Sequence, residues 1–278
     1  MQGNAGEILR TMRKRRGNYI DFFRKVRYTE KEEKTRRKAV ETNENVTLNE
    51  FEVAEDMCLD GLKIVQDTRL YRFTSDSVLL SKFAKPKKND DVADFCAGSG
   101  IVGFHFYALN KEKFPNIKVT LFELQPELTA LSKKTAALNG FENFAFVNGR
   151  LQDIPKSFNE RFSLILCNPP YEKGGFDNDE YHKAICRKEI TVNLSEIAKA
   201  AAKALKYGGR LAILNRADRL AEVCYTLKSV NIEVKKIQFV GGRYQSKPYL
   251  VMVEGVKGGK PSNDILPTIW NVKGENNG

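Results

Sequence analysis

The tetrapeptide Asn168-Pro169-Pro170-Tyr171 directly follows the apolar run 162–167 and combines hydrogen-bond acceptors with an aromatic ring. An exocyclic amine or amide nitrogen is a poor nucleophile, because its lone pair is delocalised into the ring or the carbonyl. The Asn168 side-chain oxygen and the Pro169 carbonyl oxygen can hold both N–H groups of such a nitrogen and favour its pyramidal form. The prolines stiffen the turn, and the Tyr171 ring can stack on a flat substrate. This pattern favours methyl transfer to a planar nitrogen, without a general base of shifted pKa.

Asparagine and proline also dominate ordinary turns, so the motif alone is compatible with a turn that closes a buried strand. Its context favours a binding site. The preceding residues 162–167 read FSLILC and predict a buried parallel strand, and ligands of open α/β sheets bind at the carboxyl ends of such strands.

A second group of small residues, 94–100 (DFCAGSG), follows another apolar run and precedes the apolar segment 101–104. A turn of small residues lets a ligand approach the backbone closely, unless it serves only helix–strand packing. The next predicted strand ends in Glu123, which is suited to accept hydrogen bonds from two ribose hydroxyls. Together they indicate a cofactor that carries adenosine. A dinucleotide-binding site would have glycine at position 96, so that a pyrophosphate could sit on the helix N-terminus. S-adenosylmethionine carries no phosphate and does not need this glycine.

Short apolar runs alternate with amphipathic segments from about residue 60, which predicts a doubly wound, Rossmann-like α/β fold with helices on both faces of the sheet. Helical periodicity is clearest over 126–138, where proline occupies the first turn, and over 194–205, where the glycines of 207–209 indicate the end. The connection between the last two strands is too short for a helical crossover and predicts an antiparallel hairpin near the sheet edge. The seven predicted strands are Val92–Cys96, Val119–Leu124, Phe144–Asn148, Phe162–Cys167, Arg210–Leu214, Val234–Val240 and Tyr249–Glu254.

The chain divides into three parts of different composition. Residues 1–50 form a basic N-terminal arm, predicted to be partly helical or disordered, in which aromatic residues are interleaved with basic clusters. We expect Arg15 and Arg16 of this arm to contact nucleic acid, the alternative being a merely solvated charged run. Residues 51–256 form the α/β domain, and residues 257–278 form a glycine-rich tail that we expect to be loosely ordered.

The overall composition is that of an ordinary globular domain, with 278 residues, 41% hydrophobic and 29% charged. No apolar stretch or leader pattern indicates a membrane or secretory role, so a cytoplasmic location is expected. Five scattered cysteines and two histidines predict reduced thiols and no metal site. The net charge of +11 favours a polyanionic partner, above all nucleic acid, although a lysine-rich solvated surface would have the same charge.

Through these motifs and several further segments, the chain resembles the class I, S-adenosylmethionine-dependent methyltransferases over residues 60–270. More narrowly, it resembles the bacterial tRNA(Val) (adenine-N6)-methyltransferases that modify position 37, beside the anticodon. The resemblance implies a seven-stranded methyltransferase sheet, S-adenosylmethionine as the cofactor and tRNA as the substrate. Besides the two motifs above, it rests on GLKIVQ at 61–66, FTSDSVLL at 73–80, RKEI at 187–190 and VEGVKGGKP at 253–261.

The resemblance also implies roles for particular residues. Asn168, Pro169 and Tyr171 would hold the target base, after its nucleotide has been turned out of the stack. Arg187 and Lys188 would contact phosphates. The cofactor would be bound by Asp94, Cys96, Gly98 and Gly100 around its methionine part and ribose, by Glu123 at the ribose hydroxyls, and by Thr74 and Asp76 at the border of the pocket.

Two positions depart from the family pattern. The family usually has an acidic residue, which reads the cofactor adenine, directly after the glycine that follows the third strand, but here Arg150 follows Gly149. We expect Asp153 to take over this part of cofactor binding. The family also tends to have histidine where this chain has Lys188, and the N-terminal arm lies outside the resemblance.

Other functions with related chemistry remain open. A glutamine-N5 methyltransferase of a release factor meets the same lone-pair problem with the same motif, but usually carries a distinct N-terminal helical domain. Guanine-N2 methyltransferases of ribosomal RNA and adenine-N6 methyltransferases of DNA are further alternatives. A non-catalytic RNA-binding module on the same fold would have no need of Asn168 and Glu123. The basic charge and the segment 187–190 favour an RNA methyltransferase, and the sequence indicates no oligomeric state.

Overall fold

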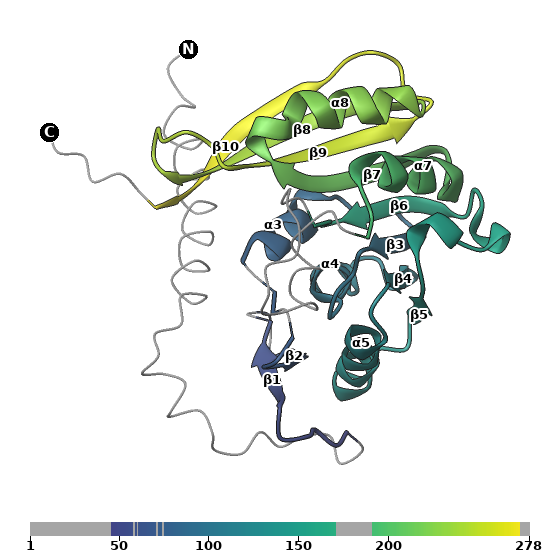
Figure 1. Ribbon diagram of the computed structural model, residues 1–278, viewed down its shortest axis with the longest axis vertical. Helices are drawn as coiled ribbons and strands as arrows, with labels where there is room; N and C mark the ends of the chain where they lie inside the picture. The colour runs from purple at the N-terminus through teal and green to yellow at the C-terminus, as the bar shows by residue number, and fades with distance from the viewer. Residues whose placement is uncertain are drawn as a thin grey trace, which may run out of the picture.

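The computed structural model describes residues 46–272, except 58, 60, 71, 74 and 171–190. These residues form a large sheet of eight strands in the order β10-β8-β9-β7-β6-β3-β4-β5, and a separate hairpin of two strands (Figure 1). The predicted α/β class is confirmed, with one strand more in the sheet than predicted. The strands are β1 (Glu52–Asp56), β2 (Lys63–Asp67), β3 (Asp91–Phe95), β4 (Lys118–Glu123), β5 (Phe144–Asn148), β6 (Phe162–Cys167), β7 (Leu205–Arg216), β8 (Ile232–Arg243), β9 (Leu250–Lys257) and β10 (Asp264–Val272).

The strand directions determine which loops lie together. Strands β7, β6, β3, β4 and β5 are parallel neighbours. Strand β9 is antiparallel to β8, as the short connection predicted, and also to β7, while β10 is parallel to β8. Because two reversals cancel, β8 and β10 run in the same direction as β7. All strands of the large sheet except β9 therefore finish at the same end of it.

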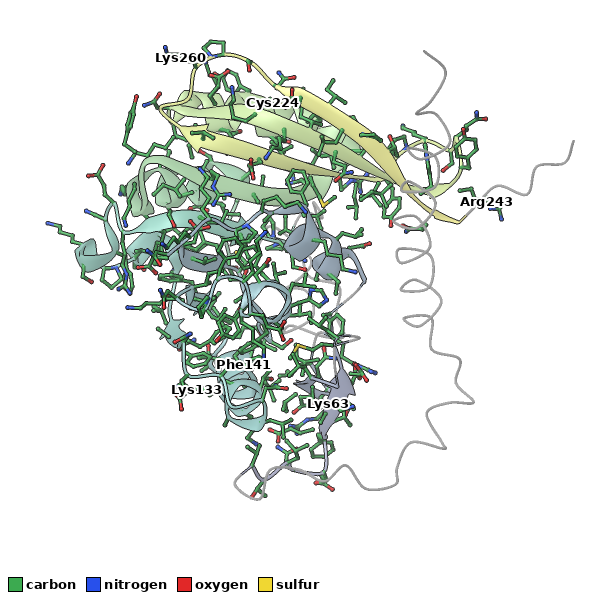
Figure 2. All side chains as sticks on the ribbon, turned by 180° about the vertical axis from the view of Figure 1, so that it is seen from behind. Lys63, Lys133, Phe141, Cys224, Arg243 and Lys260 are labelled. Carbon is green, nitrogen blue, oxygen red and sulfur yellow. The ribbon has the colours of Figure 1, made fainter. Side chains whose placement is uncertain are left out.

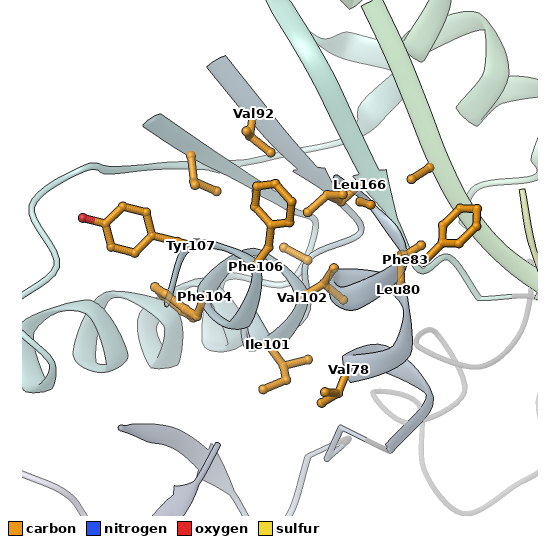
Figure 3. Close-up of a cluster of buried hydrophobic side chains, with 14 of the residues drawn as sticks. Val78, Leu80, Phe83, Val92, Ile101, Val102, Phe104, Phe106, Tyr107 and Leu166 are labelled. Carbon is orange, nitrogen blue, oxygen red and sulfur yellow. The ribbon is translucent and has the colours of Figure 1, made fainter. Parts of the chain in front are cut away.

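Helices cover both faces of the sheet. Helices α3 (Ser75–Phe83) and α4 (Ile101–Asn110) pack on one face, and α7 (Leu194–Ala204) and α8 (Leu220–Ser229) on the other, while α5 (Pro126–Leu138) packs on β4, β5 and the β1–β2 hairpin. No helix of the described residues is long and apolar enough to cross a membrane. Figure 3 shows the first of these cores, in which buried side chains of the two helices, Val78, Leu80, Phe83, Ile101, Val102, Phe104 and Phe106, meet Val92 and Leu166 of the sheet.

The junction between α7 and β7 differs from the prediction. The helix starts with a reciprocal cap, in which the Asn193 side chain accepts from the backbone N–H of Glu196 and the Glu196 side chain accepts from that of Asn193. It ends at Ala204, and the strand begins directly after it. The glycines of 207–209 lie inside β7, so they do not stop the helix. A Cβ on Gly209 would lie 2.8 Å from one backbone oxygen and 3.1 Å from another, which shows that glycine is needed for close packing of the backbone here.

The expectation of a loosely ordered tail is wrong for residues 264–272, which form β10 and pair with β8. Trp270 pairs with Gly241, and a Cβ on that glycine would lie 2.2 Å from the indole ring. The indole therefore lies against the bare backbone of β8. The sequence did not reveal this strand because Pro267 lies inside it, and proline is tolerated only on edge strands and at bulges; β10 is an edge strand whose register shifts between Leu266 and Ile269.

Candidate functional site

A cavity of about 360 Å³ opens at the end of the sheet where the parallel strands finish. Small-molecule sites usually have volumes of about 300–1,000 Å³. The walls come from residues 96–99 after β3, 123–125 at the end of β4, 149–152 after β5 and 168–170 after β6, together with the start of α3. This is where open α/β sheets bind ligands. The two motifs of the sequence, far apart along the chain, therefore line one cavity.

The turn after β3 has backbone conformations that favour glycine. Gly100 has a φ of 88° at the start of α4, and a Cβ there would lie 2.5 Å from Phe104 Cε2. Gly98 and Cys96, with φ of 59° and 57°, both line the cavity. A Cβ on Gly98 would meet no atom within 4 Å. A ligand can thus approach the backbone at Gly98, while Gly100 shapes the turn and is not among the lining residues.

Glu123 holds together two walls of the cavity, the turn after β3 and the loop after β4. One of its carboxylate oxygens accepts from the backbone N–H of Gly98 at 2.7 Å, and the other accepts from that of Gln125 at 2.9 Å. Burial raises the pKa of Glu123, and these backbone hydrogen bonds oppose the rise. Each oxygen keeps a further acceptor position. The side chain can therefore hold two ligand hydroxyls without leaving its backbone partners.

The structure does not bring Asp94 into the cavity. Asp94 is fully buried, and its Oδ2 accepts from the backbone N–H of Gly103, in the first turn of α4, at 2.9 Å. Its Oδ1 has no hydrogen-bond partner among the described residues. Burial raises the pKa of Asp94 to about 8. Its side-chain hydrogen bond is with the start of α4, and its carboxyl also interacts electrostatically with that of Glu123.

We expect Asp94→Asn to change how stability depends on pH. The native carboxyl has a pKa of about 8, whereas the unfolded value is about 3.9. Between these values the native state binds more protons than the unfolded state, so the wild-type free energy of unfolding falls as pH rises, by up to about 1.4 kcal/mol per pH unit. The variant cannot ionise at this position and should lack that slope. Urea denaturation across this range measures it, and parallel profiles for the two proteins would contradict the expectation.

Asn168 lines the cavity directly after β6 and presents an unused acceptor. Its Nδ2 donates to Ser77 Oγ at 2.9 Å, while its Oδ1 is buried and has no partner among the described residues. Leaving a buried acceptor unpaired costs about 1–3 kcal/mol. Because Asn168 lines the cavity, this unpaired oxygen is a candidate acceptor for a ligand N–H donor. Pro169 lines the same part of the cavity.

Ser77 is a site residue that the sequence reasoning did not single out. It lies in α3, is buried, and holds the Asn168 amide from a position 91 residues away in the chain. Its hydrogen bond engages the nitrogen of the amide and so leaves the oxygen for a ligand. Ser77 falls within the segment 73–80 that contributes to the family resemblance, but nothing in its local pattern reveals the contact with Asn168.

We expect Ser77→Ala to reduce kcat for methyl transfer by about ten-fold, which corresponds to one hydrogen bond of roughly 1.4 kcal/mol. Cofactor affinity should stay near the wild-type value, because the Ser77 hydroxyl bonds to the Asn168 amide and not to the Glu123 side of the cavity. The matched control is Ser81→Ala on the same helix, whose hydroxyl contacts His105 and the Val78 carbonyl away from the cavity. Equal kcat values for the two variants, at equal stability, would argue against the positioning role.

The remaining predicted residues are placed as follows. Asp76 lines the cavity, and its Oδ1 accepts from the Tyr249 hydroxyl at 3.2 Å. Burial raises the pKa of Asp76. Asp153 is exposed at the end of η1 (Leu151–Asp153) and does not line the cavity, whereas Arg150 and Gln152 do. The structure therefore does not bring Asp153 to the place expected for it. Thr74, Tyr171, Arg187, Lys188, Arg15 and Arg16 lie outside the described residues.

Metal and disulfide chemistry were not expected from the sequence. Within the described part of the chain, no group of three or more histidine, cysteine or acidic side chains could hold a metal ion. The described cysteines, Cys96, Cys167 and Cys224, are free thiols. Burial raises the pKa of Cys167 well above its ordinary value, so this thiol stays protonated.

The fold is that of a methyltransferase. Residues 74–240 match the family model "Methyltransferase small domain", which is more than half of the chain, and the protein belongs to this family. Among solved structures, it is similar to a predicted O-methyltransferase from Agrobacterium tumefaciens, with a TM-score of 0.57 and 17% identity over 71% of this chain and 88% of that one. This similarity supports the same fold. The cofactor is S-adenosylmethionine.

Two curated relatives are each named for a particular RNA substrate. Over 160 residues the chain is 26% identical to a "tRNA1(Val) (adenine(37)-N6)-methyltransferase" from Porphyromonas gingivalis, covering 55% of this chain and 61% of that protein. Over 117 residues it is 28% identical to a "Ribosomal RNA small subunit methyltransferase C" from Pseudomonas putida, covering 42% of this chain and 33% of that protein. In both cases the matched region spans less than two thirds of the relative's length.

Proposed function

We propose that the protein methylates the exocyclic N6 of an adenosine in tRNA, at position 37 beside the anticodon, with valine tRNA as the first substrate to test. The observation that carries this proposal is the unpaired, buried Oδ1 of Asn168 in the cavity that also holds Glu123. An acceptor without a partner suits a substrate that brings N–H groups. The relative from Porphyromonas gingivalis, which is named for this reaction, and the net charge of +11 support RNA as the carrier.

The residues of the cavity suit the two ligands of such a reaction. The carboxylate of Glu123 would accept the cofactor ribose hydroxyls, and the bare backbone at Gly98 leaves room for the ligand beside it. S-adenosylmethionine supplies an electrophilic methyl group on a sulfonium. Asn168 Oδ1 and the Pro169 carbonyl would accept both N–H groups of the amine, which favours the pyramidal nitrogen of the transition state over the planar ground state.

Residues outside the described part of the chain would complete the site. An anticodon-loop adenine must leave its stack to enter the cavity, and Tyr171 would replace the lost stacking with its ring. Arg187 and Lys188 would hold phosphates of the same loop, and Arg15 and Arg16 of the N-terminal arm would add further phosphate contacts. Because Asp153 is exposed, the segment 149–152, which lines the cavity, would recognise the cofactor adenine in its place.

A second candidate is guanine-N2 methylation of ribosomal RNA. Its support is the relative from Pseudomonas putida that is named as a small-subunit ribosomal RNA methyltransferase. An exocyclic guanine amine presents the same two N–H groups to Asn168 and Pro169, so the chemistry of the cavity suits both bases. A glutamine amide has the same donors, and only the substrate itself separates the three reactions.

Nucleoside mass spectrometry of RNA from cells with and without the protein tests the proposal. The expected result is loss of N6-methyladenosine from position 37 of one tRNA, restored by the wild-type protein and not by Asn168→Ala. Loss of N2-methylguanosine from ribosomal RNA would favour the second candidate. Loss of methylglutamine from a release factor, with the RNA unchanged, would overturn both RNA proposals.

A further inference from the structure

A group of aromatic and basic side chains lies at the same end of the sheet as the cavity. Strands β8 and β10 finish there beside β7, and the loop 244–249 leads from β8 into β9. Figure 2 shows Arg243 at this end of the strands and Lys260 at the opposite end. We call the group formed by Arg243, Tyr244, Lys247, Tyr249 and Trp270 the aromatic–basic ledge.

The ledge exposes rings that the fold holds in place. Tyr244 is 56% exposed and Tyr249 is 41% exposed. The Tyr244 and Trp270 rings form a T-shaped pair, with a centroid distance of 5.8 Å and an interplanar angle of 72°. Trp270 in turn lies against the backbone of β8 at Gly241. Exposed rings supported in this way suit stacking partners that bring a flat surface of their own.

The charge of the ledge is positive. The segment 243–249 reads RYQSKPY and contains no acidic residue. Arg243 and Lys247 are exposed, and no ion pair between described residues includes either of them. The acidic group near Lys247 is Asp218, which pairs with Arg216 and interacts with Lys247 only electrostatically. Basic side chains interleaved with aromatic rings are the combination with which proteins bind single-stranded nucleic acid, since the bases stack and the phosphates pair with the charges.

Hydrogen bonds connect the ledge to the cavity. The Tyr249 hydroxyl donates to Asp76, which lines the cavity, and accepts from Asn271 Nδ2 at 2.8 Å. A second hollow, lined by Asp76, Arg216, Asp218 and residues 247–250, shares Asp76 with the cavity. Tyr249 therefore links the ledge to the wall of the cavity in which Asn168 would hold its substrate.

We propose that the aromatic–basic ledge binds the single-stranded RNA nucleotides next to the target base. Tyr244 and Trp270 stack on bases, and Arg243 and Lys247 contact phosphates. The identity of the RNA as substrate rests on the function proposed above, but the binding step can be measured without methylation. The ledge contains none of the residues to which the proposed function assigns phosphate contacts.

The test measures binding of a short unstructured RNA to the full-length protein by fluorescence anisotropy over a range of salt concentrations. We expect Tyr244→Ala to weaken binding by about ten-fold at every salt concentration, because it removes a stacking surface. We expect Arg243→Ala and Lys247→Ala each to weaken binding and to reduce the slope of log affinity against log salt by about one. S-adenosylmethionine affinity, measured in parallel, should not change.

The matched controls are Tyr225→Ala, which removes a ring that is 78% exposed on α8, and Lys133→Ala, which removes an exposed charge on α5. Both should bind RNA as the wild type does. If the ledge variants bind and methylate RNA like the wild type, the RNA-binding role of the ledge is contradicted and the proposed function stands. If the wild type binds RNA through the ledge but methylates none, the RNA-binding role is supported and the proposed function fails. If the wild type binds no RNA, the RNA-binding role of the ledge is contradicted as well.

Discussion

Asn168→Ala is expected to lower kcat for methyl transfer by about 100- to 1,000-fold, the usual effect of removing a polar group that acts on a developing charge or geometry in the transition state. Among the described residues, the Asn168 side chain has one hydrogen bond, from Nδ2 to Ser77, and its Oδ1 has no partner. Single-turnover kinetics with saturating RNA and cofactor measures the loss of the chemical step directly.

Cofactor affinity and thermal stability should remain near the wild-type values, because the alanine leaves the Glu123 side of the cavity intact. Asn159→Ala is the matched control, since it removes an amide from an exposed position after η2 (Lys156–Phe158). Wild-type turnover in Asn168→Ala would show that the motif closes a strand and takes no part in the reaction.

Glu123→Gln is expected to weaken S-adenosylmethionine binding by about 100-fold, which isothermal titration calorimetry measures. Both carboxylate oxygens accept backbone hydrogen bonds, from Gly98 and from Gln125. An amide would turn its NH₂ group toward one of these N–H donors, and it would also replace the charge-assisted bonds to ribose hydroxyls, which are worth about 1.5–3 kcal/mol each.

The matched control for this variant is Glu127→Gln, which removes an exposed carboxylate in the first turn of α5. The control should bind the cofactor with wild-type affinity. An undiminished affinity in Glu123→Gln would mean that this carboxylate only ties the two loops together and does not contact the ligand.

The sequence predicts the elements whose signals are local. Helix α5 has the predicted bounds, 126–138, because Pro126 fits the first turn of a helix. Strands β5 and β6 also have the predicted bounds, since each is a short run between polar segments. The common position of the two motifs follows from the same pattern, because parallel strands place the loops that follow them at one end of the sheet.

The contacts that the sequence does not predict depend on tertiary packing. Asp94 lies in the expected motif, but its side chain bonds to the start of α4 and does not enter the cavity. The partner of Asn168 is a serine on another helix, and Ser77 has no local feature that distinguishes it from other serines. Gly209 resembles a helix stop, yet its role is to allow close packing within β7.

Strand β10 also has a consequence for how the protein behaves at high concentration. Without it, the long strand β8 would present a row of unpaired N–H and C=O groups to other chains, and such rows promote self-association. Strand β10 occupies them and becomes the outer strand itself. Its own row is interrupted by Pro267, which has no N–H, and by the register shift beside it. Strand β10 thus covers an edge that could pair with other chains, and the edge that it presents instead is a poor template for intermolecular pairing.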